Sequence, residues 1–176
     1  MQVSVITGDI TYVAADAVIT AVNSLGMWLD NGMNCVLRRA GDSLFHDQLA
    51  DALVEDPKLL VFATERGHAH LGAFDSVIFV IDNVGLNPAN NEMLNVIVRR
   101  GLVYASDHGF KRVSMPLVRF GSRREVGGTV EQKLEDIALA IRNQAADFTN
   151  SIEELTIVVY DDTAFAGILR ELLSLD

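Results

Sequence analysis

Three polar loops carry residue types that could bind a ligand, and each follows a short apolar run. The first loop, residues 23–34, reads Asn-Ser-Leu-Gly-Met-Trp-Leu-Asp-Asn-Gly-Met-Asn and leads into a predicted helix. Free backbone N–H groups at a helix start attract anions, and glycine lets a ligand approach the main chain. This loop could therefore hold phosphate. Equally, Asn31 or Asn34 could only cap the helix while Gly32 makes a turn.

The second loop, residues 117–128, holds three arginines and three glycines in a chain that is otherwise acidic. The guanidinium group is a planar fork of donors that suits phosphate, so this loop is the best local candidate for anion recognition. Arg123 and Arg124 could equally form a solvated pair on the surface.

The third loop, residues 161–165, reads Asp-Asp-Thr-Ala-Phe and opens the last predicted helix with a capping residue. Phe165 falls in the first turn of that helix. An aromatic ring there can pack inward as part of the core. At the carboxyl end of a strand it can also stack on a nucleobase, which stabilises binding by about 1–3 kcal/mol.

Several other chemistries lack support in the sequence. Gly67-His68-Ala69-His70 places two histidines two residues apart, without cysteine or carboxylate at ligand spacing, so we expect surface histidines and no metal site. The chain has no Walker-type lysine loop, no G-x-G-x-x-G after a strand and no G-x-S-x-G elbow. Kinase, classical dinucleotide-binding and serine-hydrolase functions are therefore not indicated, and we expect no cofactor.

Short β-branched runs alternate with helical patterns along most of the chain. The predicted strands are residues 2–6, 16–22, 58–64, 76–81, 112–115 and 155–160. The predicted helices are residues 33–40, 43–53, 91–108 before Gly109, 130–148 after the N-cap Thr129, and one that begins near Thr163.

This alternation predicts an α/β fold with three α/β/α layers. We expect a mixed, mostly parallel sheet of about six strands with helices on both faces, formed by residues 1–176 as a single domain. In such folds ligands bind outside the carboxyl ends of the strands. The loops after Val22, Met115 and Tyr160 are therefore the places where we expect a ligand to bind.

Composition narrows the possible partners. The 176 residues include 14 Lys and Arg against 24 Asp and Glu, for a formal charge of −10, which argues against general nucleic-acid or anionic-membrane binding. No apolar stretch approaches the roughly 18 residues of a membrane span. The lone Cys35 and the lack of a basic-then-apolar leader at Met1 predict a protein of the reducing cytoplasm.

Five segments, taken in order, resemble one known family over almost the whole chain. They are Gly8-Asp9-Ile10-Thr11, residues 16–24, Arg39-Ala40-Gly41, residues 101–116, and residues 158–165. The first two are similar to the G-D-I-T and D-A-I-V-N-A-A-N-S motifs that open a macrodomain, the ADP-ribose-binding module. The others are similar to the end of its first loop-helix unit, its approach to the second phosphate loop, and its last strand and helix start.

The resemblance implies roles for particular residues. Asp9 would accept a hydrogen bond from the adenine amino group, the Ile10 N–H would contact the ring, and Phe165 would pack on adenine. The amide of Asn23 would bind the distal ribose, because it can both donate and accept hydrogen bonds. The resemblance places Gly32 and Met33 in the first phosphate-side loop, and Arg119, Phe120, Gly121 and Ser122 in the second.

The chain departs from the family pattern at both phosphate loops. Residues 28–33 read Trp-Leu-Asp-Asn-Gly-Met where the family commonly has G-G-G-V-D, and the second loop lacks the S-T-G-I-Y or G-C-G pattern. Met33 falls where hydrolytic members often carry an acidic residue, and no lysine lies nearby to act as a nucleophile. Catalysis would therefore rest on Asp30 activating water beside Asn23; an exposed Asp30 could equally be only solvated.

The resulting functional prediction is a protein that binds ADP-ribose or a related ADP-ribosyl nucleotide. Its partner would be ADP-ribose or an ADP-ribosylated protein, and hydrolysis of ADP-ribosyl groups is an open extension. The alternative is a divergent macrodomain that has lost its ligand and acts as a protein-interaction module. Trp28, Leu29 and Met33 filling the cleft would favour that alternative.

Overall fold

The computed structural model describes residues 1–22, 32–41, 44–67, 70–82, 92–118, 120 and 129–174. Six strands within these residues form one sheet: β1 (Gln2–Thr7), β2 (Ala15–Val22), β3 (Val61–Ala63), β4 (Phe74–Ile81), β5 (Arg112–Pro116) and β6 (Glu154–Val159). Their order across the sheet is β1-β6-β5-β2-β4-β3. All neighbouring pairs are parallel except β3 with β4, which confirms the mixed, mostly parallel sheet.

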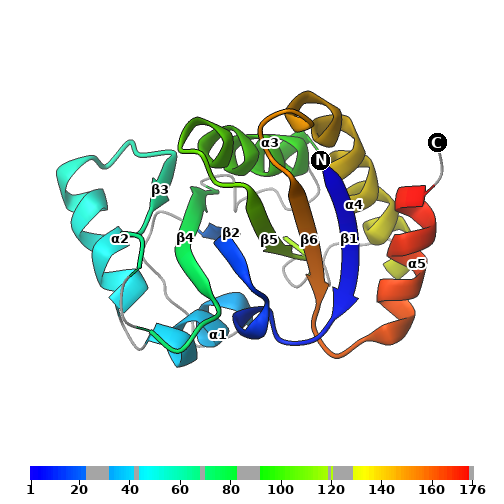
Figure 1. Cartoon of the computed structure of the whole chain (residues 1–176), viewed down its shortest axis with the longest axis horizontal. Coiled ribbons are helices and arrows are strands. Elements are labelled where there is room, and N and C mark those ends of the chain that lie inside the picture. The colour runs from blue at the N-terminus through cyan, green and yellow to red at the C-terminus, as the bar shows by residue number, and fades with distance from the viewer. Residues whose placement is uncertain are drawn as a thin grey trace.

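Five α-helices and two short 3₁₀ helices complete the described residues. They are α1 (Gly32–Gly41), α2 (Leu44–Glu55), α3 (Glu92–Asp107), α4 (Val130–Ala145) and α5 (Thr163–Ser174), with η1 (Ile10–Tyr12) and η2 (Ala146–Phe148). Figure 1 shows α1 and α2 away from the group formed by α3, α4 and α5. The helices cover both faces of the sheet, as predicted for an α/β/α protein.

Two hydrophobic clusters lie on the two faces of the sheet. The large cluster joins the sheet to α3, α4 and α5 and includes Ile19, Ile78, Leu102, Ile137 and Ile157. The small cluster joins it to α1 and α2 and includes Val18, Val77, Phe79, Leu37 and Leu49. Side chains alternate along a strand, so neighbours such as Val18 and Ile19 enter opposite clusters. Strands buried on both faces explain why the apolar runs in the sequence are nearly continuous.

Two helix ends were predicted from single residues, and both predictions are confirmed. The Thr129 hydroxyl accepts a hydrogen bond from the Gln132 amide at 3.2 Å and caps α4. Gly109 follows α3 with φ of +71°, a conformation that glycine adopts without steric cost, and the Phe110 amide donates to the Ala105 carbonyl at 2.9 Å.

The predicted strand at residues 58–64 is too long, because β3 spans only Val61–Ala63. An Asx turn occupies the preceding residues: the Lys58 amide donates to Oδ1 of Asp56 at 2.9 Å, and the Leu59 amide donates to the Asp56 carbonyl at 3.1 Å. An aspartate side chain that bonds its own backbone two residues later competes with strand pairing.

The expectation of surface histidines is wrong for His70. Its ring stacks on Phe74 with centroids 4.8 Å apart and meets Phe45 edge-on at 5.1 Å. The His70 Nδ1 accepts a hydrogen bond from the Gly72 amide at 3.0 Å. Two apolar rings and one backbone donor therefore hold a half-buried imidazole that the sequence pattern did not distinguish from a solvated one. His68 lies outside the described residues.

Candidate functional site at the carboxyl edge of the sheet

Five parallel strands, β1, β6, β5, β2 and β4, have their carboxyl ends at the same edge of the sheet. Figure 1 shows β1 and β6 running side by side to that edge, where α5 begins. The register pairs Thr7 with Val159 and Pro116 with Val158, so β1, β6 and β5 end side by side. The β2 strand lies next to β5 and ends at Val22. The segments that follow Val22, Pro116 and Val159 therefore all start from this edge.

The loop after β1 turns sharply and presents Asp9. Gly8 has φ of +149°, which is a glycine conformation, and its amide donates to the Val159 carbonyl at 3.0 Å. Asp9 then caps η1: its Oδ1 accepts from the Thr11 amide at 2.9 Å and from the Thr11 hydroxyl at 2.7 Å. Within the described residues no donor reaches the other oxygen, Oδ2. One acceptor atom of a half-buried carboxylate thus stays available to a ligand.

Ile10 supplies a donor beside that acceptor. Its side chain is 4% exposed in the small cluster, and its carbonyl accepts from the Val13 amide at 3.1 Å. The Ile10 N–H opens η1, where the first amides of a helix have no partner inside the helix. No carbonyl of the described residues accepts from it. Adjacent residues therefore offer one acceptor and one donor.

The start of α5 lies next to this loop, because β6 pairs with β1. Oδ1 of Asp162 accepts from the Phe165 amide at 2.9 Å, and the Asp162 carbonyl accepts from the Ala166 amide at 3.2 Å, so Asp162 is the capping residue that the sequence indicated. Asp161 has φ of +50°, a left-handed conformation that aspartate tolerates better than most residues. These contacts fix Phe165 in the first turn of α5.

Phe165 and Phe120, two of the predicted ligand residues, contact each other. Their ring centroids are 5.5 Å apart at an interplanar angle of 61°. Phe120 is 8% exposed and belongs to the large cluster, against which the half-buried Phe165 packs. Both interpretations offered for Phe165 are compatible with this arrangement: it packs on the core and retains accessible surface at the carboxyl edge.

Of the remaining predicted site residues, two lie within the described part of the chain. Gly32 is the first residue of α1, and Met33 is half-buried against the small cluster. The predicted catalytic and phosphate-side residues outside the described ranges are Asn23, Asp30, Arg119, Gly121 and Ser122. Their roles stay predictions.

Two exposed aromatic residues at this edge were missed by the sequence reasoning. Tyr160 is 67% exposed directly after β6, and Tyr12 is 80% exposed at the end of η1. Since Val159 accepts from the Gly8 amide, Tyr160 lies one residue beyond the bond that anchors the Asp9 loop. A tyrosine immediately after a buried strand was the available signal, because it places an aromatic ring at a ligand-binding edge.

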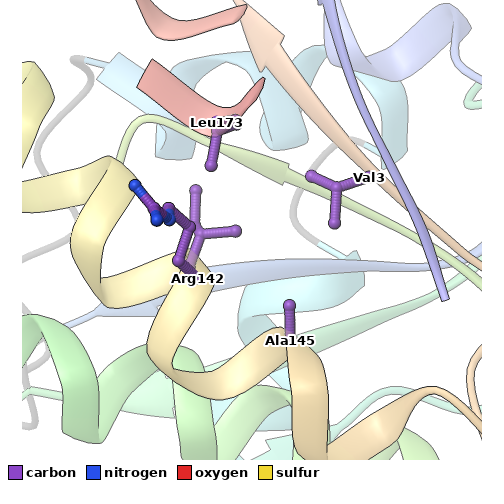
Figure 2. Close-up of a pocket in the computed structure, with 5 residues that line it drawn as sticks. Val3, Arg142, Ala145 and Leu173 are labelled. Carbon is purple, nitrogen blue, oxygen red and sulfur yellow. The ribbon is translucent and has the colours of Figure 1, made fainter. Parts of the chain in front are cut away.

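Two cavities described in the protein lie away from these residues. One of about 230 Å³ is lined by Val3, Ile141, Arg142, Ala145 and Leu173, between β1, α4 and α5. Figure 2 shows the Arg142 guanidinium directed away from Val3 and Ala145. The other, of about 180 Å³, is lined by Ala63, Thr64, Arg66, Tyr104, His108 and Phe110.

Within the described ranges, no group of three or more histidine, cysteine, aspartate or glutamate side chains could hold a metal ion. None of the helices described is both long enough and apolar enough to cross a membrane.

Comparison with known proteins agrees with the resemblance read from the sequence. No family model matches the chain. A macro domain-containing protein of Cupriavidus necator is 27% identical over 178 residues, which cover 98% of this chain and 98% of the relative.

Solved structures give the same result. The Oceanobacillus iheyensis macrodomain with ADP superimposes with a TM-score of 0.73 at 15% identity, covering 96% of this chain and 88% of that one. The Trypanosoma brucei macrodomain in complex with ADP-ribose has a TM-score of 0.71 at 15% identity, covering 98% and 69%. At such identities the likeness shows a shared fold.

Proposed function

Because this chain is a macrodomain by its fold, we propose that the carboxyl edge of its sheet binds ADP-ribose or a related ADP-ribosyl nucleotide. The two solved macrodomains compared with it are complexes with ADP and with ADP-ribose, which supports the ligand class. Fold alone does not determine function, so the proposal depends on the site residues.

The observation that carries the proposal is the pair formed by Asp9 and Ile10. Oδ2 of Asp9 can only accept a hydrogen bond when ionised, and the Ile10 N–H can only donate. The Watson–Crick edge of adenine offers the complementary pair, a donor at the exocyclic amine and an acceptor at N1. Guanine and hypoxanthine reverse this pattern. The site is therefore suited to a 6-aminopurine.

Aromatic rings complete the proposed adenine site. The Phe165 amide donates a hydrogen bond to Asp162 and its ring contacts Phe120, so both contacts fix its position. Tyr160 is exposed next to the Asp9 loop. Rings held in this way bind a base at a low cost in conformational entropy. The diphosphate would lie toward Gly32 and Arg119, and the distal ribose toward Asn23.

Hydrolysis of ADP-ribosyl groups is a further step of the proposal, with Asp30 activating water beside Asn23. With this hydrolytic activity, the physiological partner would be an ADP-ribosylated protein in the cytoplasm. Loss of turnover in Asp30→Ala with binding retained would support this step. Unchanged turnover would remove Asp30 from the mechanism.

Calorimetric titration with ADP-ribose tests the binding proposal, with AMP and ADP as shorter ligands. We expect saturable one-to-one binding that weakens about tenfold or more in Asp9→Asn, because the amide places a donor where adenine also donates. The two Thr11 donors should keep the amide oxygen at the Oδ1 position, so the Asp9→Asn side chain cannot simply rotate to avoid the clash. Asp51→Asn, at an exposed position of α2, is the matched control.

If the wild-type protein gives no heat with millimolar ADP-ribose, the binding proposal is wrong. The protein-interaction module would then be the function to test. If Asp9→Asn and Asp51→Asn both bind like the wild type, the nucleotide binds elsewhere on the protein.

A further inference from the structure

A cavity of about 180 Å³ lies at the edge of the sheet opposite to the proposed nucleotide site. Its lining residues are Ala63, Thr64, Arg66, Tyr104, His108 and Phe110. The turn that holds Arg66 is bonded to the start of β4, because the Gly67 amide donates to the Asp75 carbonyl at 3.2 Å. Phe110 lies just before the start of β5. Since the carboxyl ends of β4 and β5 are at the nucleotide edge, the two sites are separate.

The Arg66 side chain is held in place although it is exposed. Its guanidinium carbon lies 3.8 Å from the centroid of the Phe110 ring, and that ring is only 3% exposed. Its Nη2 donates to the His108 carbonyl at 2.6 Å. An exposed arginine normally loses rotamer freedom when it binds a ligand, and these two contacts lower that entropic cost. The guanidinium group is therefore preorganised.

The same guanidinium group retains donors that could bind a ligand. Arginine has five N–H groups, and one of them donates to the His108 carbonyl. Neither ion pair between described residues includes Arg66, so no carboxylate in this part of the chain neutralises it. A guanidinium group beside a cavity is suited to a carboxylate, which can accept two parallel N–H bonds.

The end of α3 would repel an anion if its last carbonyl groups had no donors. Donors from beyond the helix reach the carbonyl groups of Tyr104, Ala105, Ser106 and His108. Glu65 and Asp107 are exposed carboxylates adjacent in sequence to lining residues, but neither lines the cavity. The charge at the cavity wall is therefore that of Arg66.

Tyr104 and His108 form the aromatic part of the wall. Their rings stack with centroids 3.9 Å apart at an interplanar angle of 7°. Nδ1 of His108 donates to the Tyr104 carbonyl at 2.9 Å, because a carbonyl can only accept, and this bond fixes the imidazole ring. Burial raises the pKa of Tyr104 more than its bond with the Ala63 backbone lowers it. The hydroxyl therefore stays protonated and can donate to an anion.

We propose that this cavity binds a small aromatic carboxylate. The carboxylate would accept from the remaining N–H groups of Arg66, and the ring would pack against Tyr104 and Ala63. A cavity of about 150 Å³ holds one benzene ring, so this one has room for a single six-membered ring and not for a nucleotide. The inference does not depend on the proposed function.

The test is an NMR titration of the backbone amides with benzoate, because a ligand of this size binds with a Kd of about 1 mM. Benzamide, a neutral ligand of the same shape, tests the need for the charge. Arg66→Gln removes the cation. Arg142→Gln is the matched control, because Arg142 is also exposed and lines the other cavity. Arg66→Lys is the second variant, which keeps a donor for the His108 carbonyl should glutamine prevent folding.

We expect saturable shifts in the wild type at residues 63–66 and 108–110. The affinity for benzoate should fall about tenfold or more in Arg66→Gln, and about threefold or more in Arg66→Lys, since an ammonium group lacks the planar fork. Arg142→Gln should match the wild type within about twofold. Benzamide should bind the wild type about tenfold more weakly than benzoate. The affinity of Arg66→Gln for ADP-ribose should be that of the wild type.

Four outcomes would overturn the inference. The first two are the absence of saturable shifts around the cavity and equal benzoate affinity in the wild type and Arg66→Gln. Loss of benzoate binding in Arg142→Gln alone would place the ligand in the other cavity. Equal affinity for benzamide and benzoate would show a site that recognises the ring and not the carboxylate. An arginine that only fastened the end of α3 would give a lower Tm in Arg66→Gln and no benzoate response in the wild type.

Discussion

Phe165 in the first turn of α5 meets Phe120 edge to face, with ring centroids 5.5 Å apart and ring planes at 61°. The two residues are 45 positions apart in sequence, and the contact joins the turn after β5 to the helix after β6. Phe120 lies on the core side, so it limits how far the Phe165 ring can move. The proposed adenine surface is thus supported by the large cluster.

This contact predicts energetic coupling between the two rings. In a double-mutant cycle with Phe120→Leu and Phe165→Leu, we expect a coupling of about 0.5–1.5 kcal/mol in the free energy of unfolding. Phe120→Leu should also weaken ADP-ribose binding, although its ring is buried. Urea denaturation measures the coupling. Additive effects within about 0.3 kcal/mol would show that the contact does not position Phe165.

Thr11 should control base selectivity through Asp9. Its amide and hydroxyl both donate to Oδ1, which leaves Oδ2 as the free acceptor. Thr11→Val removes the hydroxyl and keeps the shape, so we expect a loss of about 1 kcal/mol in stability and a reduced preference for ADP-ribose over its hypoxanthine analogue. Thr11→Ser should restore the preference. Competition binding with the two nucleotides measures it, and an unchanged ratio in Thr11→Val would assign Thr11 a purely structural role.

The fold could be predicted from the sequence because the patterns that define it are local. Alternating strands and helical stripes located every described strand and α-helix, and Thr129 and Gly109 marked helix ends by their side-chain and backbone chemistry. The prediction failed at residues 58–60, where the Asp56 side chain bonds the backbone. It also failed at His70, whose ring contacts the nearby Phe74 and also Phe45, which belongs to a different element, α2.

The candidate site was less predictable, because its properties depend on contacts across the sheet. Asp9 and Phe165 were indicated by resemblance to a family. The free oxygen of Asp9 follows only from the Thr11 bonds. The exposure of Tyr160 follows only from the packing of whole elements.

Asp16 should contribute to stability at neutral pH and lose that contribution in acid. Burial raises its pKa, but the amides of Arg112 and Lys111 and the Arg112 guanidinium outweigh burial, so the pKa is lower than usual. A carboxyl with a lower pKa in the folded state stabilises the protein above its unfolded pKa, about 3.9. This stability is lost as pH falls through the folded pKa.

Asp16→Asn is therefore expected to lower the free energy of unfolding by about 1–2 kcal/mol at pH 7, and by progressively less below about pH 4. Urea denaturation at pH 7, 5 and 3 measures the difference. Asp107→Asn, at an exposed position at the end of α3, is the control and should show no such convergence with the wild type. A difference that stays constant down to pH 3 would mean that the Asp16 charge does not contribute.

Asp161 has the left-handed backbone conformation that connects β6 to α5, with φ of +50°. Asp161→Gly should leave stability unchanged within about 0.5 kcal/mol, because glycine adopts this conformation freely. Asp161→Val should cost about 1–2 kcal/mol, since a β-branched side chain clashes with its own backbone there.

Relief of that strain would move the Asp162 cap, and with it the Phe165 amide that donates to Asp162. We therefore expect Asp161→Val, but not Asp161→Gly, to weaken ADP-ribose binding, which calorimetry on both variants would measure. Equal affinities would show that the turn holds Phe165 less firmly than the cap and the Phe120 ring do.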